Sequence, residues 1–101
     1  MNVTETLAQF IVDTKYDNLP PAVVEAAKIG ILDGVANIVA GSVQELATIV
    51  GNYVKDVGGT PQSTVVGWDF KTHATNAAFA NGIFGHCLDY EIQGFPPTHG
   101  T

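Results

Sequence analysis

Apolar residues recur along most of this chain at alternating steps of three and four positions, the spacing of one face of an α-helix. The clearest run follows Ser42 and contains Leu46, Ile49, Val50, Tyr53, Val54 and Val57. Similar but weaker runs occur before and after it. The pattern predicts four main helices, near residues 4–16, 21–40, 43–57 and 72–90.

The predicted helices have typical boundary residues. Asn2 with Glu5, and Ser42 with Glu45, have the spacing of a capping box, in which each side chain accepts a hydrogen bond from the other residue's backbone. The pair Pro20-Pro21 suits an opening turn, because the missing N–H has no helical partner there. Glycine suits helix ends, and it follows the second and third helices at Gly41 and at Gly58-Gly59.

The second predicted helix has a broad apolar face. Its stripe consists of Val24, Ala27, Ile31, Val35 and Ile38, widened by Leu32 and Val39. On this pattern, Asp33 and Asn37 face away from the stripe. We therefore expect the stripe to be a face that contacts other protein.

A short β excursion separates the third and fourth helices. Ser63-Thr64-Val65-Val66 is β-branched in character and lies between Pro61 and Gly67, which predicts a strand near 63–67. The next residues, 67–71, form a turn or the far arm of a hairpin, and Thr72 can cap the last helix. The predicted fold class is therefore all-α: a bundle of about four helices with one short strand or hairpin.

Composition changes the picture of the surface. Apolar residues make up 46% of the 101 residues and charged residues 14%, against roughly 25% charged in ordinary soluble domains. A small domain with so few charged residues cannot present a fully polar surface. We therefore expect apolar faces that another protein or the rest of a larger chain covers. We also expect the isolated chain to associate.

The charges exclude some classes of partner. The net charge is −6, with four separated lysines and no arginine, so neither nucleic acid nor an anionic membrane surface is an expected partner. Cys87 is the only cysteine, which rules out a disulfide within the chain and fits a reducing compartment. We see no signal peptide and no membrane span, and we expect a cytoplasmic protein.

Candidate chemistry is concentrated after Ala77. On the last predicted helix, Gly82, His86 and Asp89 fall on one face, in line with a row of small residues at Ala74 and Ala78. Such a face predicts close approach to a neighbouring helix.

Asp89 and His99, ten residues apart, could meet as an orienting carboxylate and an acid/base imidazole. His86 is a second possible partner for the carboxylate. The alternative is a solvated helix-end carboxylate and a surface loop histidine. The spacing of His86, Asp89 and His99 matches no standard set of metal ligands, so we assign no metal. We interpret Cys87 as a small packing residue and His73 as a surface residue.

Three segments of the sequence resemble the N-terminal part of the MmgE/PrpD family. They are residues 78–82 (AFANG), residues 86–91 (HCLDYE) and the pair Thr98-His99. Residues 26–28, 31–36 and 63–67 fit the family's second helix and the strand that follows. The resemblance covers essentially all of residues 1–101, which we interpret as one segment of a helical domain.

The resemblance implies a large all-helical domain, a smaller α/β domain, a homodimer, and activity without a bound metal or other cofactor. It implies that Asp89 and His99 are catalytic and that His86, Asn81 and Gln93 contact the substrate, a small di- or tricarboxylate that is dehydrated, decarboxylated or epimerised. Four scattered lysines cannot neutralise such a substrate, so this segment would be catalytically incomplete on its own. The alternative is a non-catalytic helical module that keeps the fold and uses its apolar faces for association.

Overall fold

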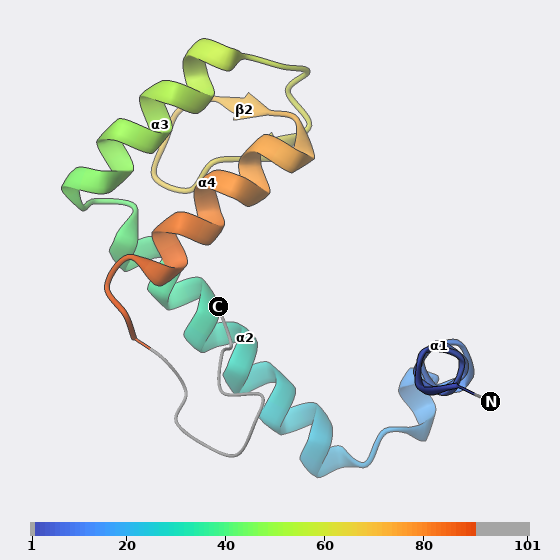
Figure 1. Cartoon of the computed structure of the whole chain (residues 1–101). Coiled ribbons are helices and arrows are strands. Elements are labelled where there is room, and N and C mark those ends of the chain that lie inside the picture. Colours follow the sequence, from blue (N-terminus) through green and yellow to red (C-terminus); the bar gives the residue numbers. More distant parts are fainter. Residues whose placement is uncertain (1, 91–101) are drawn as a thin grey trace.

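The computed structural model describes residues 2–90 and contains four α-helices and one small hairpin (Figure 1). The helices are α1 (Val3–Asp13), α2 (Pro21–Gly41), α3 (Glu45–Val57) and α4 (Ala74–His86). A 3-10 turn, η1 (Tyr16–Asn18), joins α1 to α2, and the hairpin consists of β1 (Ser63–Thr64) and β2 (Lys71–Thr72). The predicted all-α class with one hairpin is confirmed.

Capping explains where the first helices begin and end. The predicted capping box of α1 is present: Glu5 N–H donates to Asn2 Oδ1 at 2.8 Å, and Asn2 N–H donates to Glu5 Oε2 at 3.1 Å. The helix stops at Asp13 rather than near residue 16, because Thr14 is already extended and its hydroxyl donates to the Phe10 carbonyl. Pro21 opens α2, as predicted.

The capping box predicted at Ser42 is wrong. The Ser42 hydroxyl donates to the Val39 carbonyl at 2.7 Å, so it terminates α2 instead of starting α3. Gln44 takes the N-cap position of α3 with an extended backbone. At the other end α3 stops at Gly58, whose φ of 71° lies in the left-handed region that glycine adopts readily.

The β excursion is shorter than predicted and pairs with a second strand. Ser63 lies opposite Thr72 and Thr64 opposite Lys71 in an antiparallel ladder. Thr72 therefore belongs to β2 and does not cap α4; its hydroxyl donates to the Gly58 carbonyl at 3.0 Å. The fourth helix is consequently Ala74–His86 rather than 72–90.

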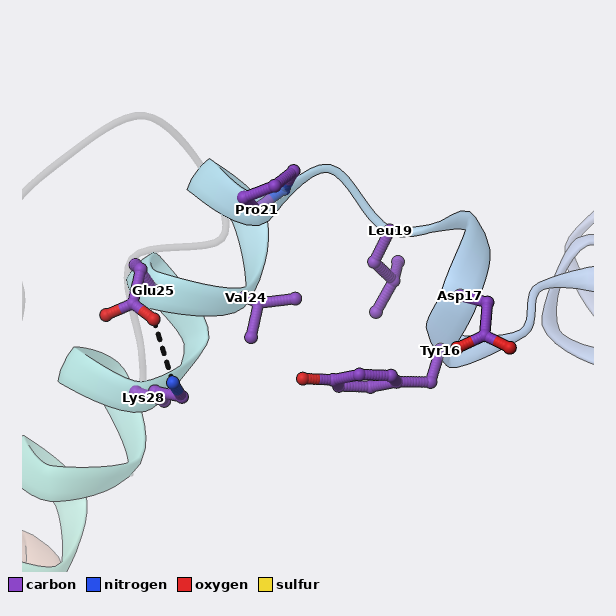
Figure 2. Close-up of a pocket in the computed structure, with 7 residues that line it drawn as sticks. All are labelled: Tyr16, Asp17, Leu19, Pro21, Val24, Glu25 and Lys28. Carbon is purple, nitrogen blue, oxygen red and sulfur yellow. Dashed lines mark hydrogen bonds and ion pairs between the residues drawn. The ribbon is translucent and has the colours of Figure 1, made fainter.

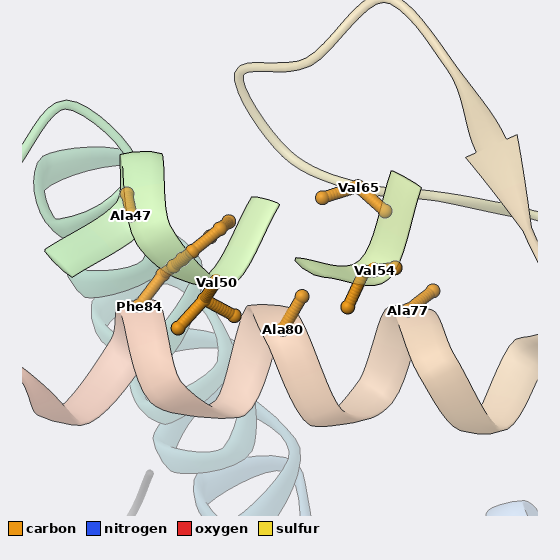
Figure 3. Close-up of a cluster of buried hydrophobic side chains, with 7 residues drawn as sticks. All are labelled: Ala47, Val50, Val54, Val65, Ala77, Ala80 and Phe84. Carbon is orange, nitrogen blue, oxygen red and sulfur yellow. The ribbon is translucent and has the colours of Figure 1, made fainter. Parts of the chain in front are cut away.

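The core lies between α3 and α4, and the loop after β1 closes it (Figure 3). Its buried residues are Ala47, Val50 and Val54 on α3, Val65 in the loop, and Ala77, Ala80 and Phe84 on α4. Trp68 and Phe70 pack at its margin in an edge-to-face pair with ring centroids 5.7 Å apart. The interpretation of these two rings as hairpin packing is confirmed.

Two predicted faces are oriented differently in the structure. The α2 stripe is largely exposed, with Ile31 at 68% and Leu32 at 70%, whereas Asn37 is buried. Ala74, Ala78 and Gly82 are also exposed, because α4 turns its Ala77–Ala80–Phe84 side to α3. Helical periodicity shows where an apolar stripe lies on a helix. It does not show whether that stripe packs against another element of the same chain or stays exposed.

The molecule is extended, and α1 stands apart from the other helices (Figure 1). No residue of α1 is buried. The chain exposes 7370 Å², against about 5,500 Å² expected for a compact monomer of this mass. None of the helices described here is long and apolar enough to cross a membrane. The expected uncovered apolar faces are therefore present on α1 and α2.

Candidate functional site

The candidate catalytic carboxylate lies in a tight turn at the end of α4. The helix closes with the Cys87 N–H donating to the Ile83 carbonyl at 3.0 Å, and the Asp89 N–H then donates to the His86 carbonyl at 2.9 Å. Asp89 has a φ of 55°, in the left-handed region. Aspartate is one of the few residues other than glycine that adopt this region readily. The turn leaves the Asp89 side chain exposed.

Helix α2 contacts this turn through a buried amide. The Asn37 side chain donates from Nδ2 to the Tyr90 carbonyl at 3.2 Å and to Asp33 Oδ2 at 3.3 Å. Asn37 is only 8% exposed. Asp33, Asn37 and Gly41 follow at steps of four, so they form one stripe along α2. This stripe faces the end of α4, whereas of the apolar stripe only Ile38 packs against the core.

Gly41 sets how closely the two helices approach. A Cβ at this position would lie 1.8 Å from the Phe84 carbonyl oxygen and 2.9 Å from Cys87 Sγ. Cys87 is half-buried, and its thiol donates to the Phe84 carbonyl at 3.3 Å. Only a residue without a side chain fits at Gly41, so the close approach predicted from small residues does occur, but on a different face of α4.

His86 and Asp89 are both exposed at the α4 end. His99 and Gln93 lie outside the described residues. The pairing of Asp89 with His99, and the substrate contacts expected from His86 and Gln93, therefore stay predictions.

Asn81 links α4 to the backbone beside β1 through its side-chain amide. Its Oδ1 accepts a hydrogen bond from the Val66 N–H at 2.9 Å, and its Nδ2 donates to the Thr64 carbonyl at 3.0 Å. Both groups of the amide thus bond the backbone where the chain leaves β1. The amide fastens the hairpin to α4, and contact of Asn81 with substrate stays a prediction.

Three of the four lysines have partners in the structure. Lys28 is paired with Glu25 at 2.8 Å, Lys15 donates to the Val12 carbonyl, and Lys55 lies over the Phe70 ring at 5.8 Å from its centroid. Within residues 2–90 no group of three His, Cys, Asp or Glu side chains has a geometry that could hold a metal ion. Three of the four lysines are thus already engaged within the part of the chain that the structure describes.

One hollow, of about 340 Å³, lies away from this turn, between η1 and the first turns of α2 (Figure 2). Tyr16, Leu19 and Val24 form its apolar part, and the Glu25–Lys28 ion pair lies at one side. The lysine charge is already matched by the glutamate, so the hollow has little attraction for a free carboxylate. It contains none of the predicted site residues.

Sequence reasoning placed Asp33 and Asn37 away from the apolar stripe of α2 but missed their contact with the end of α4. The available signal was the four-residue spacing of Asp33, Asn37 and Gly41, a narrow stripe of polar and small residues on an otherwise apolar helix. Such a stripe suits close contact with a backbone that has exposed carbonyls, as the end of a helix does.

The comparisons with known proteins cover the described part of the candidate site. The sequence profile of the MmgE/PrpD N-terminal domain matches residues 5–91. Cis-aconitate decarboxylase from Mus musculus is 33% identical over 99 residues, which are 97% of this chain and 20% of the relative. The Homo sapiens protein of the same name is 32% identical over 99 residues, with 97% and 21% covered. No solved structure gives a significant match. The chain spans about one fifth of the length of these curated relatives.

Proposed function

The chain belongs to the MmgE/PrpD family, and from this membership we propose that it is the N-terminal part of an enzyme that acts on small di- or tricarboxylates by acid/base catalysis. The observation that carries the proposal is the family match over residues 5–91, which includes Asp89 in its turn. Similarity to two cis-aconitate decarboxylases makes an unsaturated tricarboxylate the first substrate to test.

In the proposed decarboxylation, the bond between carbon and the departing carboxylate breaks and CO₂ leaves. The electron pair stays on the substrate as a carbanion-like centre, which then takes a proton at carbon. His99 supplies this proton, and Asp89 orients the imidazole and favours its charged form. His86, Asn81 and Gln93 are proposed to contact the substrate. A dehydration or an epimerisation would use the same two groups to move a proton at carbon.

The charges of the substrate must be neutralised by other protein. Each carboxylate needs a cation or several N–H donors, and three of the four lysines already contact a carboxylate, a carbonyl or an aromatic ring. The exposed stripe on α2 and the exposed α1 give that other protein a surface to pack on. We propose that it is the rest of an MmgE/PrpD enzyme, working as a homodimer without a metal or other cofactor.

The test is proton NMR of cis-aconitate and 2-methylcitrate incubated in D₂O with the protein as its gene encodes it. We expect loss of substrate signals and, for decarboxylation, a product with one deuteron at the new C–H position. His99→Ala should slow turnover roughly 100-fold or more, in the range of a lost general acid/base. His73→Ala is the matched control, because His73 is an exposed histidine of the β2–α4 junction. Equal turnover by His99→Ala and the parent protein would contradict the assigned role.

A second candidate function is supported by the exposed apolar faces alone. A non-catalytic helical module would use the α2 stripe, including Leu32, for association and would need neither Asp89 nor His99. The same NMR experiment separates the two functions. A folded protein that binds a partner through α2 but turns over no carboxylate is the module.

A further inference from the structure

We propose that Asn37 and Asp33 of α2 are positioning residues that hold the Asp89–Tyr90 turn in its working conformation. The inference rests on the proposed function, because it gives the two residues a role in catalysis only if Asp89 has one. Neither residue is expected to touch the substrate. Their effect is on the backbone that carries the carboxylate.

The turn is anchored on both sides of Asp89. On one side its own N–H donates to the His86 carbonyl at 2.9 Å. On the other side the Tyr90 carbonyl accepts from Asn37 Nδ2 at 3.2 Å. Asn37 comes from a helix 53 residues earlier in the sequence, so the second anchor ties the turn to a separate element. Together the two bonds define the path of the backbone through Asp89.

Asp89 lies in the left-handed region, which aspartate adopts more readily than most residues but which the contacts around the turn still have to select. At a φ of 55° a residue with a Cβ is less stable than in the ordinary helical or extended regions. Residues in sparsely populated regions keep this conformation only when surrounding contacts determine it. Loss of the Asn37 bond would let the chain relax after His86 and swing the carboxylate to another direction.

Asp33 fixes the orientation of the Asn37 side-chain amide. Its Oδ2 accepts one hydrogen of Nδ2 at 3.3 Å, which leaves the second hydrogen for the Tyr90 carbonyl. An amide turned the other way would present its oxygen to the Asp33 carboxylate and to the Tyr90 carbonyl, and both contacts would be repulsive. The Asn37 amide therefore has one favourable orientation, in which its NH₂ group donates to both the Asp33 carboxylate and the Tyr90 carbonyl.

Because position 37 is buried, only a side chain that donates both of these hydrogen bonds suits it. Asn37 is 8% exposed, so water cannot easily replace its hydrogen bonds. The neighbouring Gly41 brings α2 against the end of α4, which leaves the amide within reach of the turn. A misplacement of about 1 Å at an acid/base group can cost roughly 100-fold in rate. A residue outside the active site can thus control the rate through the turn.

The experiment uses the protein as its gene encodes it, with cis-aconitate as the substrate. Asn37→Leu removes both donors while it keeps the volume of the side chain. Asn52→Leu is the matched control, because it makes the same substitution at an exposed position of α3. We expect Asn37→Leu to lower kcat roughly 10-fold to 100-fold with a smaller change in KM, and Asn52→Leu to stay within about 3-fold of the parent. Equal kcat for Asn37→Leu and the parent would overturn the inference.

A double-mutant cycle with Asp89→Asn separates positioning from general damage. If Asn37 acts through Asp89, Asn37→Leu should have little further effect on kcat in the Asp89→Asn background. Full additivity of the two effects would overturn the inference. If Asp89→Asn alone leaves kcat unchanged, the proposed function fails instead.

Amide hydrogen exchange provides a readout that does not need activity. Exchange at the Asp89 amide should be roughly 10-fold faster in Asn37→Leu than in the parent protein, while the Val54 amide in the core exchanges equally in both. Unchanged protection of Asp89 in Asn37→Leu would show that the turn does not depend on α2, and the inference would then be wrong.

Discussion

Replacing Gly41 with alanine should force α2 and α4 apart. The added Cβ would lie 1.8 Å from the Phe84 carbonyl oxygen and 2.6 Å from its carbon. Both are backbone atoms, which cannot rotate away as the end of a side chain can. The two helices would have to separate by about 1.5 Å to restore ordinary contact.

The matched control lies on the same helix. A Cβ at Gly30 meets nothing within 4 Å, so Gly30→Ala should gain only the helix propensity of alanine, about 0.5–1 kcal/mol. Overpacking of a tight contact costs about 1–3 kcal/mol, and we take the upper end because backbone is involved. Gly41 stands at the last turn, where the gain in propensity is smaller. We therefore expect the two variants to differ by about 3 kcal/mol in free energy of unfolding.

The assay is urea unfolding of the 101-residue chain at low concentration, followed by far-ultraviolet circular dichroism and by the fluorescence of Trp68, the single tryptophan. A slope of about 1–3 kcal/mol/M converts the difference to a separation of about 1–3 M in midpoint. Gly41→Ala should unfold first, or be unfolded in buffer. A midpoint for Gly41→Ala equal to or above that of Gly30→Ala would refute the close approach of α2 and α4.

Three further predictions follow from other contacts. Gly51→Ala should lower stability by about 1–3 kcal/mol and change Trp68 fluorescence, because its Cβ would lie 2.0 Å from the indole; an unchanged spectrum and midpoint would count against this packing. Asn81→Ala should cost about 2 kcal/mol, since it leaves two backbone groups near β1 unpaired, whereas exposed Asn52→Ala should cost less than about 0.5 kcal/mol; equal midpoints would show that the amide does not fasten the hairpin. Leu32→Gln should weaken association of the 101-residue chain in analytical ultracentrifugation without loss of helix content, and unchanged association would place the contact elsewhere.

Local rules predicted the elements of this fold well. The Asn2–Glu5 capping box, Pro21 at a helix start and Gly58 at a helix end each depend on backbone hydrogen bonds within a few residues. The capping box predicted at Ser42 was wrong because the hydroxyl had two possible backbone partners, and it bonds the Val39 carbonyl of α2. A sequence pattern contains both possibilities and does not rank them.

The environment of the candidate site was harder to predict, because it depends on which faces meet. Periodicity placed Asn37 opposite an apolar stripe, which normally means solvent. In the structure the stripe is exposed and Asn37 is buried, since α4 packs on the narrow polar and small side of α2. Asp89, in contrast, was predicted as a site residue from a motif that resembles a known family, and such a prediction does not require knowledge of packing.

The claim that this chain contributes an acid/base carboxylate to an enzyme is tested most directly by one ratio of rates. Turnover of cis-aconitate is followed by proton NMR for the encoded protein with Asp89→Asn and with Asp69→Asn, an exposed aspartate of the hairpin turn. We expect Asp69→Asn to match the parent and Asp89→Asn to be slower by roughly 100-fold, in the range of a lost acid/base contribution. Equal rates for the two variants, from a protein that does turn over cis-aconitate, would contradict the account.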